Sequence, residues 1–198
     1  MQNERQPKSL DELIALTREA LDSGELSEEQ KVELEERCRT IKEMPEEERE
    51  SLHYFLRHMP YQESDLTLIV LKGHLLLEQK VREFINERML NPEALKAARL
   101  TSHQAICLAE ALTLPNDDPK VLWSILRNVN TLRNDLAHNL APQKVERLVR
   151  AIESEFATFG SVQSGFVGIL GHLYAQLAEL CRMAREPEYR VKGKNSSL

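Results

Sequence analysis

The sequence predicts an all-α protein, and three observations support that fold class. Apolar residues recur every three or four positions along most of the chain, which places them on one face of a helix. The 198 residues include only 7 glycines and 8 prolines, and the prolines fall where helices are expected to begin or end. No stretch alternates between apolar and polar residues with a period of two, so no β-strand is expected.

Three short helices are expected at the N-terminal end. Residues 9–12, Ser-Leu-Asp-Glu, form a capping box that begins the first helix, which should end near Ser23. Residues 27–30, Ser-Glu-Glu-Gln, form a second capping box. Pro45 and the three glutamates after it begin a third helix, expected to end near His58, because carboxylates favour the positive end of the helix dipole. The second helix has a thin apolar stripe, made of Val32, Leu34, Cys38 and Ile41.

A helical bundle is expected to follow this arm. Its first helix is long and rich in leucine, from Ser64 to Met89. Further helices are expected at residues 102–114, at residues 119–139, from Pro142 onward, and after Gly160 as far as Arg185. Residues 186–198 are polar and carry no apolar stripe. The predicted organisation is therefore a helical arm of residues 1–60, a bundle of residues 61–185 and a disordered tail.

Charge is divided unevenly between these parts. Residues 1–50 carry 16 acidic and 8 basic side chains, whereas the rest of the chain carries 16 acidic and 18 basic side chains. The net charge of −6 therefore describes neither part. An acidic helical extension precedes a nearly neutral body, so the acidity of the chain does not argue against nucleic-acid binding by that body.

Secreted and membrane proteins are not expected from this sequence. The polar first residues lack the apolar stretch of a secretory signal, and the most apolar window, Phe166–Leu180, is too short and too polar to cross a membrane. Three cysteines, Cys38, Cys107 and Cys181, lie far apart, which suggests neither a disulfide framework nor a zinc knuckle. We therefore expect a cytoplasmic protein with no membrane contact.

Cofactor and metal sites are not expected either. The histidines at positions 53, 58 and 74 lack the compact spacing of metal ligands. The chain has no glycine-rich phosphate loop. It also has no helix-turn-helix with a basic recognition helix, the feature that would support a DNA-binding regulator.

The most informative stretch is residues 129–138, Val-Asn-Thr-Leu-Arg-Asn-Asp-Leu-Ala-His. It places the polar Asn134 directly after Arg133, and His138 five positions beyond that arginine. An offset of five positions on a regular helix is a rotation of about 140°. The two side chains therefore converge if the helix loosens before Pro142, or more easily if two copies of the chain meet.

Such a pair suits metal-independent cleavage of RNA. A histidine can accept the proton of a ribose 2′-hydroxyl or donate one to the leaving oxygen, and an arginine can hold the phosphate and stabilise its developing charge. Two copies about a two-fold axis would supply a base, an acid and two guanidinium groups. A structural interpretation is also open: Arg133 can pair with Asp135 or Glu110, and His138 suits the negative end of a helix dipole.

Residues 130–138 resemble the motif of HEPN domains, helical domains marked by an arginine, a polar residue, three further residues and a histidine. The leucine-rich residues 68–78 resemble the first bundle helix of many members. The resemblance covers residues 64–160, roughly half of the chain, and leaves out the acidic arm.

The resemblance implies a homodimer with Arg133 and His138 at the dimer cleft and Asn134 orienting the pair. Many members are RNases that act as toxins or antiphage defence effectors, restrained in some cases by an antitoxin or another regulatory protein; others bind RNA or nucleotides, or only mediate association. Toxins paired with a nucleotidyltransferase antitoxin often carry a tyrosine two positions after the histidine. This chain has Leu140 there, so control through a modified tyrosine is not expected.

Glu78 is a further candidate for the site. It lies in a helical stripe that is otherwise mostly apolar, with Leu71, Leu75, Arg82 and Ile85. Its carboxylate can join Arg133, or it can pair with Arg82 one turn further along the same helix. His74, one turn before it, is expected to be a partly buried helix histidine.

The sequence thus predicts an all-α, HEPN-like bundle with an acidic N-terminal extension, acting on RNA as a metal-independent endoribonuclease. His138 would be the acid and base, Arg133 the phosphate ligand, Asn134 the orienting residue and Glu78 a fourth member. The alternative is a non-catalytic interaction or regulatory module: a dimeric scaffold, a nucleotide-binding or partner-binding module, or a transcription regulator. We hypothesise that the acidic arm covers the basic cleft as a mimic of RNA.

Overall fold

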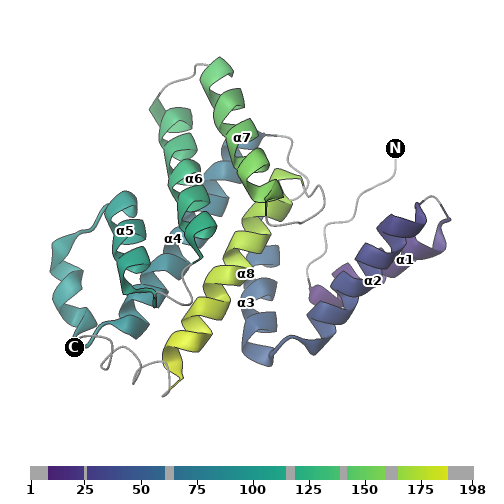
Figure 1. Ribbon diagram of the computed structural model, residues 1–198, viewed down its shortest axis with the longest axis horizontal. Helices are drawn as coiled ribbons and strands as arrows, with labels where there is room; N and C mark the ends of the chain where they lie inside the picture. Colours follow the sequence, from purple (N-terminus) through teal and green to yellow (C-terminus); the bar gives the residue numbers. More distant parts are fainter. Residues whose placement is uncertain are drawn as a thin grey trace. The chain divides into compact units, whose positions relative to one another are not determined.

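The computed structural model describes residues 9–24, 26–60, 65–114, 119–138, 142–158 and 165–186. These ranges contain eight α-helices and one 3-10 helix, with no β-strand (Figure 1), which confirms the all-α prediction. In chain order the helices are α1 (Leu10–Asp22), α2 (Glu28–Glu43), α3 (Glu46–His58), α4 (Leu66–Arg88), η1 (Pro92–Ala98), α5 (Ser102–Leu112), α6 (Lys120–His138), α7 (Pro142–Ala157) and α8 (Phe166–Arg185). Apart from Glu186, the expected tail lies outside the described residues.

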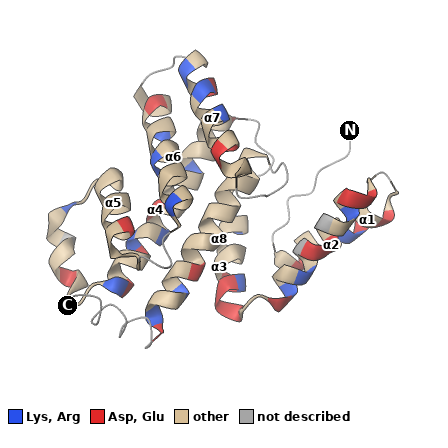
Figure 2. Cartoon of the chain, viewed as in Figure 1, with Lys and Arg blue, Asp and Glu red and all other residues tan. Residues whose placement is uncertain are grey.

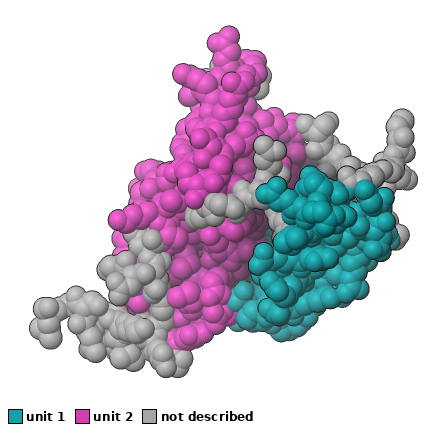
Figure 3. Space-filling model, turned by 45° about the vertical axis from the view of Figure 1, so that its right-hand side comes forward, with its two compact units in different colours: residues 1–62 teal, residues 63–198 magenta. Residues whose placement is uncertain are grey.

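The chain divides into two compact units, residues 1–62 and residues 63–198 (Figure 3). Unit 1 contains α1, α2 and α3, and unit 2 contains all the later helices. The division falls close to the boundary that the sequence places after residue 60. Each unit has buried apolar side chains of its own.

Unit 1 is held together by α1, which packs against both α2 and α3. Leu10 of α1 and Phe55 of α3 are buried, and so is Cys38 of α2. Val32, however, is 62% exposed, so the thin apolar stripe on α2 is not covered at that residue. The turn of α2 at Cys38 is covered by its neighbours, whereas the turn at Val32 faces solvent.

Unit 2 is built around α4, which contacts α5, α6 and α8. The contact with α8 is close at Gly73, where a Cβ atom would lie 2.5 Å from Cδ1 of Leu170. Leu75, a member of the expected apolar stripe, is 62% exposed, whereas Val70 and Leu77 of the same helix are buried. The largest fully buried side chains of this unit include Phe84, Trp123, Tyr174, Leu77, Leu122 and Ile125.

The connection between α4 and α5 differs from the sequence prediction. Pro92–Ala98 form a 3-10 helix where no helix is predicted, and Arg99 follows it in the left-handed conformation with φ of 45°. The N-cap of α5 is Thr101, whose hydroxyl accepts a hydrogen bond from the backbone of Gln104. Ser102, where the helix is expected to begin, donates its hydroxyl hydrogen to Glu78.

Helices α6 and α7 pack against each other as a hairpin that extends beyond the other helices of unit 2 (Figure 1). Ile152 and Phe156, near the end of α7, are buried. Val145, Leu148 and Val149, nearer its beginning, are only half-buried. The far end of this hairpin therefore carries apolar side chains that the chain itself covers only in part.

Candidate functional site

The predicted motif lies on the last turns of α6, at the far end of the hairpin. Helix α6 continues through His138, so it does not loosen between the two motif residues. Their offset of five positions therefore keeps its rotation of about 140°. Arg133 is half-buried and His138 is exposed. A single copy of α6 presents the guanidinium and the imidazole on different faces of the helix.

Arg133 is held by the residue directly after it. Nη1 of Arg133 donates a hydrogen bond of 3.0 Å to Oδ1 of Asn134, so the polar position of the motif does contact the arginine. Neither of the two acidic partners considered from the sequence binds Arg133. Glu110 forms an ion pair with Arg127, and Asp135 pairs with a lysine of α7.

Asp135 was considered from the sequence only as a partner of Arg133, and its actual partner lies on the next helix. It is buried, at 6% exposed, and its Oδ1 lies 2.7 Å from Nζ of Lys144. This ion pair joins the last turn of α6 to the first turn of α7, three residues before His138. Asp135 and Lys144 are nine positions apart, and they meet because α6 and α7 pack as a hairpin. No local pattern in the sequence indicates that these two residues pair.

Glu78 lies on the side of α4 that faces α5, where it contacts Ser102. Arg82 donates two hydrogen bonds to its Oε1, at 2.6 and 2.9 Å. Ser102 donates one to its Oε2, at 2.7 Å. In the part of the chain that the structure describes, no hydrogen bond or ion pair joins Glu78 to Arg133. Of the two partners considered from the sequence, the carboxylate binds Arg82.

The environment of Glu78 keeps its carboxylate ionised. Burial alone would raise its pKa, but hydrogen bonds from Ser102 and Arg82 and the charge of Arg82 outweigh burial and lower the pKa below its ordinary value. Glu78 therefore links α4 to α5 as a charged and well-bonded group.

His74 is the most buried histidine near the motif, at 4% exposed. Its Nε2 lies 3.1 Å from Oδ1 of Asn130 on α6, and its Nδ1 lies 3.8 Å from Oε2 of Glu78. Burial lowers the pKa of His74, and the nearby charge of Arg133 lowers it further, against the opposing effects of Asn130 and Glu78. The sequence predicts a partly buried histidine here but gives no sign of its partner on α6.

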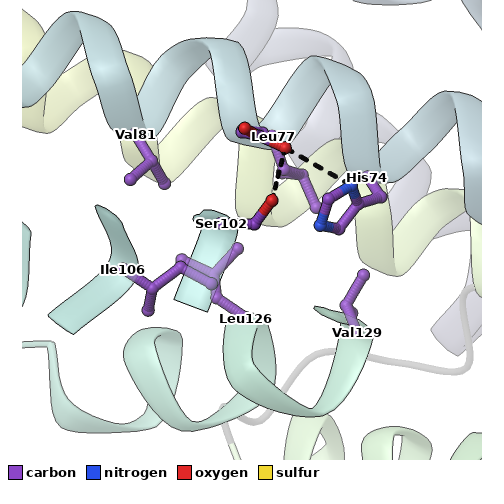
Figure 4. Close-up of a pocket in the computed structure, with 8 residues that line it drawn as sticks. His74, Leu77, Val81, Ser102, Ile106, Leu126 and Val129 are labelled. Atoms are coloured by element: carbon purple, nitrogen blue, oxygen red, sulfur yellow. Dashed lines mark hydrogen bonds and ion pairs between the residues drawn. The ribbon is translucent and has the colours of Figure 1, made fainter. Parts of the chain in front are cut away.

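These polar groups border a small hollow between α4, α5 and α6 (Figure 4). It contains about 260 Å³ of empty space, including its opening to solvent. Dashed lines in Figure 4 mark the contacts of the Glu78 carboxylate with Ser102 and His74. The other walls are apolar and are formed by Leu77, Val81, Ile106, Leu126 and Val129.

Basic residues recur along the exposed side of α7 (Figure 2). Lys144, Arg147 and Arg150 are spaced by three positions and are all exposed. Two of them have acidic partners: Lys144 binds Asp135, and Nη2 of Arg150 lies 3.8 Å from Glu146. Arg133, near the end of α6, is a further cation on the same hairpin.

The described ranges hold neither a cluster of metal ligands nor a membrane-spanning helix. No group of three or more His, Cys, Asp or Glu side chains is arranged there to hold a metal ion. No helix in those ranges has the length and apolar character needed to cross a membrane. The three cysteines are free thiols, of which Cys107 is exposed and the other two are buried. Comparisons with models of known families, with curated proteins and with solved structures give no match.

Proposed function

We propose that this protein is a metal-independent endoribonuclease of the HEPN type, whose active cleft forms between two copies of the chain. The observation that carries the proposal is the exposed end of α6, where Arg133 is paired with Asn134 and His138 faces solvent. Because α6 stays helical through His138, one chain supplies the two groups on different faces, and a second copy is needed to complete the cleft.

In this mechanism His138 of one copy accepts the proton of a ribose 2′-hydroxyl. The 2′-oxygen forms a bond to the neighbouring phosphorus, and the bond from phosphorus to the 5′-oxygen breaks. His138 of the other copy, protonated beforehand, gives its proton to that leaving oxygen. Arg133 holds the phosphate and stabilises the charge on it, and Asn134 orients the guanidinium. The products are a 2′,3′-cyclic phosphate and a free 5′-hydroxyl.

The surface of the hairpin supports association of two copies. Val145, Leu148 and Val149 of α7 are half-buried next to the motif, and apolar surface left exposed in one chain favours burial against a partner. The cations on the same hairpin suit the phosphates of RNA. In a toxin or antiphage defence role within the cytoplasm, a regulatory protein would restrain this activity by covering the same surface.

The second candidate is a non-catalytic interaction module. The half-buried apolar residues of α7 also support this function, because they favour a dimer or a bound partner whether or not any chemistry takes place. In that case Arg133 and Asn134 would serve only as an interface pair, with no role for proton transfer by His138.

A cleavage assay separates the two candidates. Purified protein is incubated with a labelled RNA in the presence of EDTA, and the ends of the products are analysed for the cyclic phosphate. General acid–base catalysis contributes about 10²–10⁴-fold, and electrostatic stabilisation of the transition state contributes about 10²–10³-fold. His138→Ala and Arg133→Ala should therefore each reduce the rate by at least about 10²-fold.

His103→Ala is the matched control, since His103 is an exposed histidine on α5 of the same unit, and it should keep the wild-type rate. Full activity in both motif variants would contradict the assignment of the site. A wild-type protein that forms dimers but leaves RNA intact would favour the interaction module.

A further inference from the structure

We infer that His74 and Asn130 form a positioning pair that fixes the rotation of α6, and thereby the direction in which Arg133 and Asn134 point. The contribution of this pair to cleavage rests on the proposed function, whereas its effect on the geometry of α6 does not. Neither residue touches the proposed cleft, so both act through their neighbours.

The pair is a buried polar link between two helices. His74 on α4 is 4% exposed and Asn130 on α6 is 7% exposed, and they meet at 3.1 Å. Because Oδ1 of Asn130 is an acceptor, the ring donates through Nε2. The neighbours on α6 are Leu126 and Val129, which are buried and apolar. A hydrogen bond in such surroundings is directional, whereas apolar packing tolerates small rotations.

The position of Asn130 along α6 connects it to the motif. Asn134 is one turn further along and lies about 40° from Asn130 around the helix axis, and Arg133 lies about 60° from it on the other side. The same sector of α6 therefore carries the buried anchor and the pair joined by the 3.0 Å hydrogen bond between Arg133 and Asn134. Catalytic groups need to be held within roughly 10–20° of their productive direction, and a rotation of α6 by that amount would misplace the guanidinium.

The charged groups around His74 agree with this arrangement. On its own helix, Glu78 lies 3.8 Å from Nδ1. From α6, the charge of Arg133 reaches the imidazole. On α5, Ser102 binds Glu78 and is linked to His74 through that carboxylate. On α8, the apolar Leu170 packs against Gly73, the residue before His74. His74 is thus influenced both by the carboxylate of Glu78 and by the guanidinium of Arg133. Glu78 supports the positioning pair instead of entering the cleft.

Four variants of the full-length chain test the inference. His74→Leu leaves the amide of Asn130 without its partner. His74→Gln retains a donor near the position of Nε2. The double variant His74→Leu with Asn130→Leu removes both polar groups, which restores stability when the two replacements pack well. His103→Leu changes an exposed histidine on α5 and is the control.

The readouts separate positioning from stability. Unfolding in urea reports stability, and cleavage of RNA gives kcat and KM. The side-chain NMR signals of Arg133 Nε–H and of the Asn134 amide report the geometry of the pair. We expect the double variant to be folded, to lose about 10²-fold in kcat with KM changed less than about twofold, and to show displaced signals for both side chains. His74→Gln should recover most of kcat, and the control should match wild type.

Two results would overturn the inference. The first is a folded double variant that cleaves RNA with the wild-type kcat. The second is a folded double variant in which the Arg133 and Asn134 signals stay in place, and this applies even if the wild-type protein cleaves no RNA. Absence of cleavage by the wild type with displaced signals in the double variant would reject the proposed function while supporting the positioning pair.

Discussion

At the scale of single residues, the buried His74 makes stability depend on pH. Burial holds the pKa of this imidazole below its ordinary value of 6.5, so the unfolded chain takes up the proton more readily than the folded chain does. The stabilising contribution is therefore complete above about pH 6.5 and is lost as the pH falls from there toward the folded-state pKa.

We expect the free energy of unfolding in urea to fall as the pH is lowered from 7.5 to 5, and to fall less in His74→Gln. An equal decline in both proteins would show that other groups cause it.

Glu78 affects stability at lower pH. Its folded-state pKa lies below 4.5, so its contribution to stability is present above pH 4.5 and is lost only below it. Glu78→Gln should therefore alter the decline below pH 4.5. Because the charge of Glu78 raises the pKa of His74, the same variant should also deepen the decline between about pH 6.5 and 5.

Residues were predictable from the sequence where their partners are local. The neighbours Arg133 and Asn134, and the i, i+4 pair of Glu78 and Arg82, are both found in the structure. The contacts of His74 with Asn130 and of Asp135 with Lys144 depend on how helices pack. No spacing in the sequence indicates them.

At the scale of helices, the packing of α4 on α8 depends on the absence of a side chain at Gly73. A Cβ atom there would lie 2.5 Å from Leu170, so Gly73→Ala forces the two helices or the leucine to move. Overpacking of this kind costs about 1–3 kcal/mol, which exceeds the gain in helix propensity from alanine.

Urea unfolding measures this cost, with Leu75→Ala as the control, because Leu75 is exposed on the same helix and should change stability by less than about 0.5 kcal/mol. The double variant Gly73→Ala with Leu170→Ala relieves the clash, so the two effects should not add. If they add, the close approach at Gly73 is not the cause of the loss.

Most of the helices could be predicted from the capping residues, the prolines and the spacing of apolar residues in the sequence. The exceptions have physical reasons. The helix expected from Ser102 onward is capped one residue earlier, by Thr101, and the hydroxyl of Ser102 binds Glu78. Val32 and Leu75 lie in apolar stripes of the sequence and yet are exposed, because a stripe shows which face is apolar but not which of its turns meets a neighbour.

At the scale of the molecule, the acidic arm and the bundle are separate compact units. The acidic side chains concentrate in residues 1–50, which carry 16 of them and only 8 basic ones. If the arm competes with RNA for the cations of the hairpin, deletion of residues 1–60 should raise the affinity for RNA by about tenfold at low salt. The difference should shrink as salt is added.

Fluorescence anisotropy with a labelled single-stranded RNA measures this effect at several salt concentrations. A truncated chain that melts cooperatively and binds RNA no more tightly than the full chain would reject competition by the arm. The uneven distribution of charge could be predicted from the sequence. The surface that the arm contacts could not, because it depends on the packing of two separate units.

The hairpin of α6 and α7 also bears on how this protein can change over evolutionary time. Arg133, Asn134 and His138 lie on its half-buried or exposed surface, while the bundle is stabilised elsewhere by fully buried side chains such as Trp123 and Tyr174. Substitutions at exposed positions cost little folding energy. A lineage can therefore lose the proposed reaction through one or two replacements at the hairpin and keep the same folded scaffold.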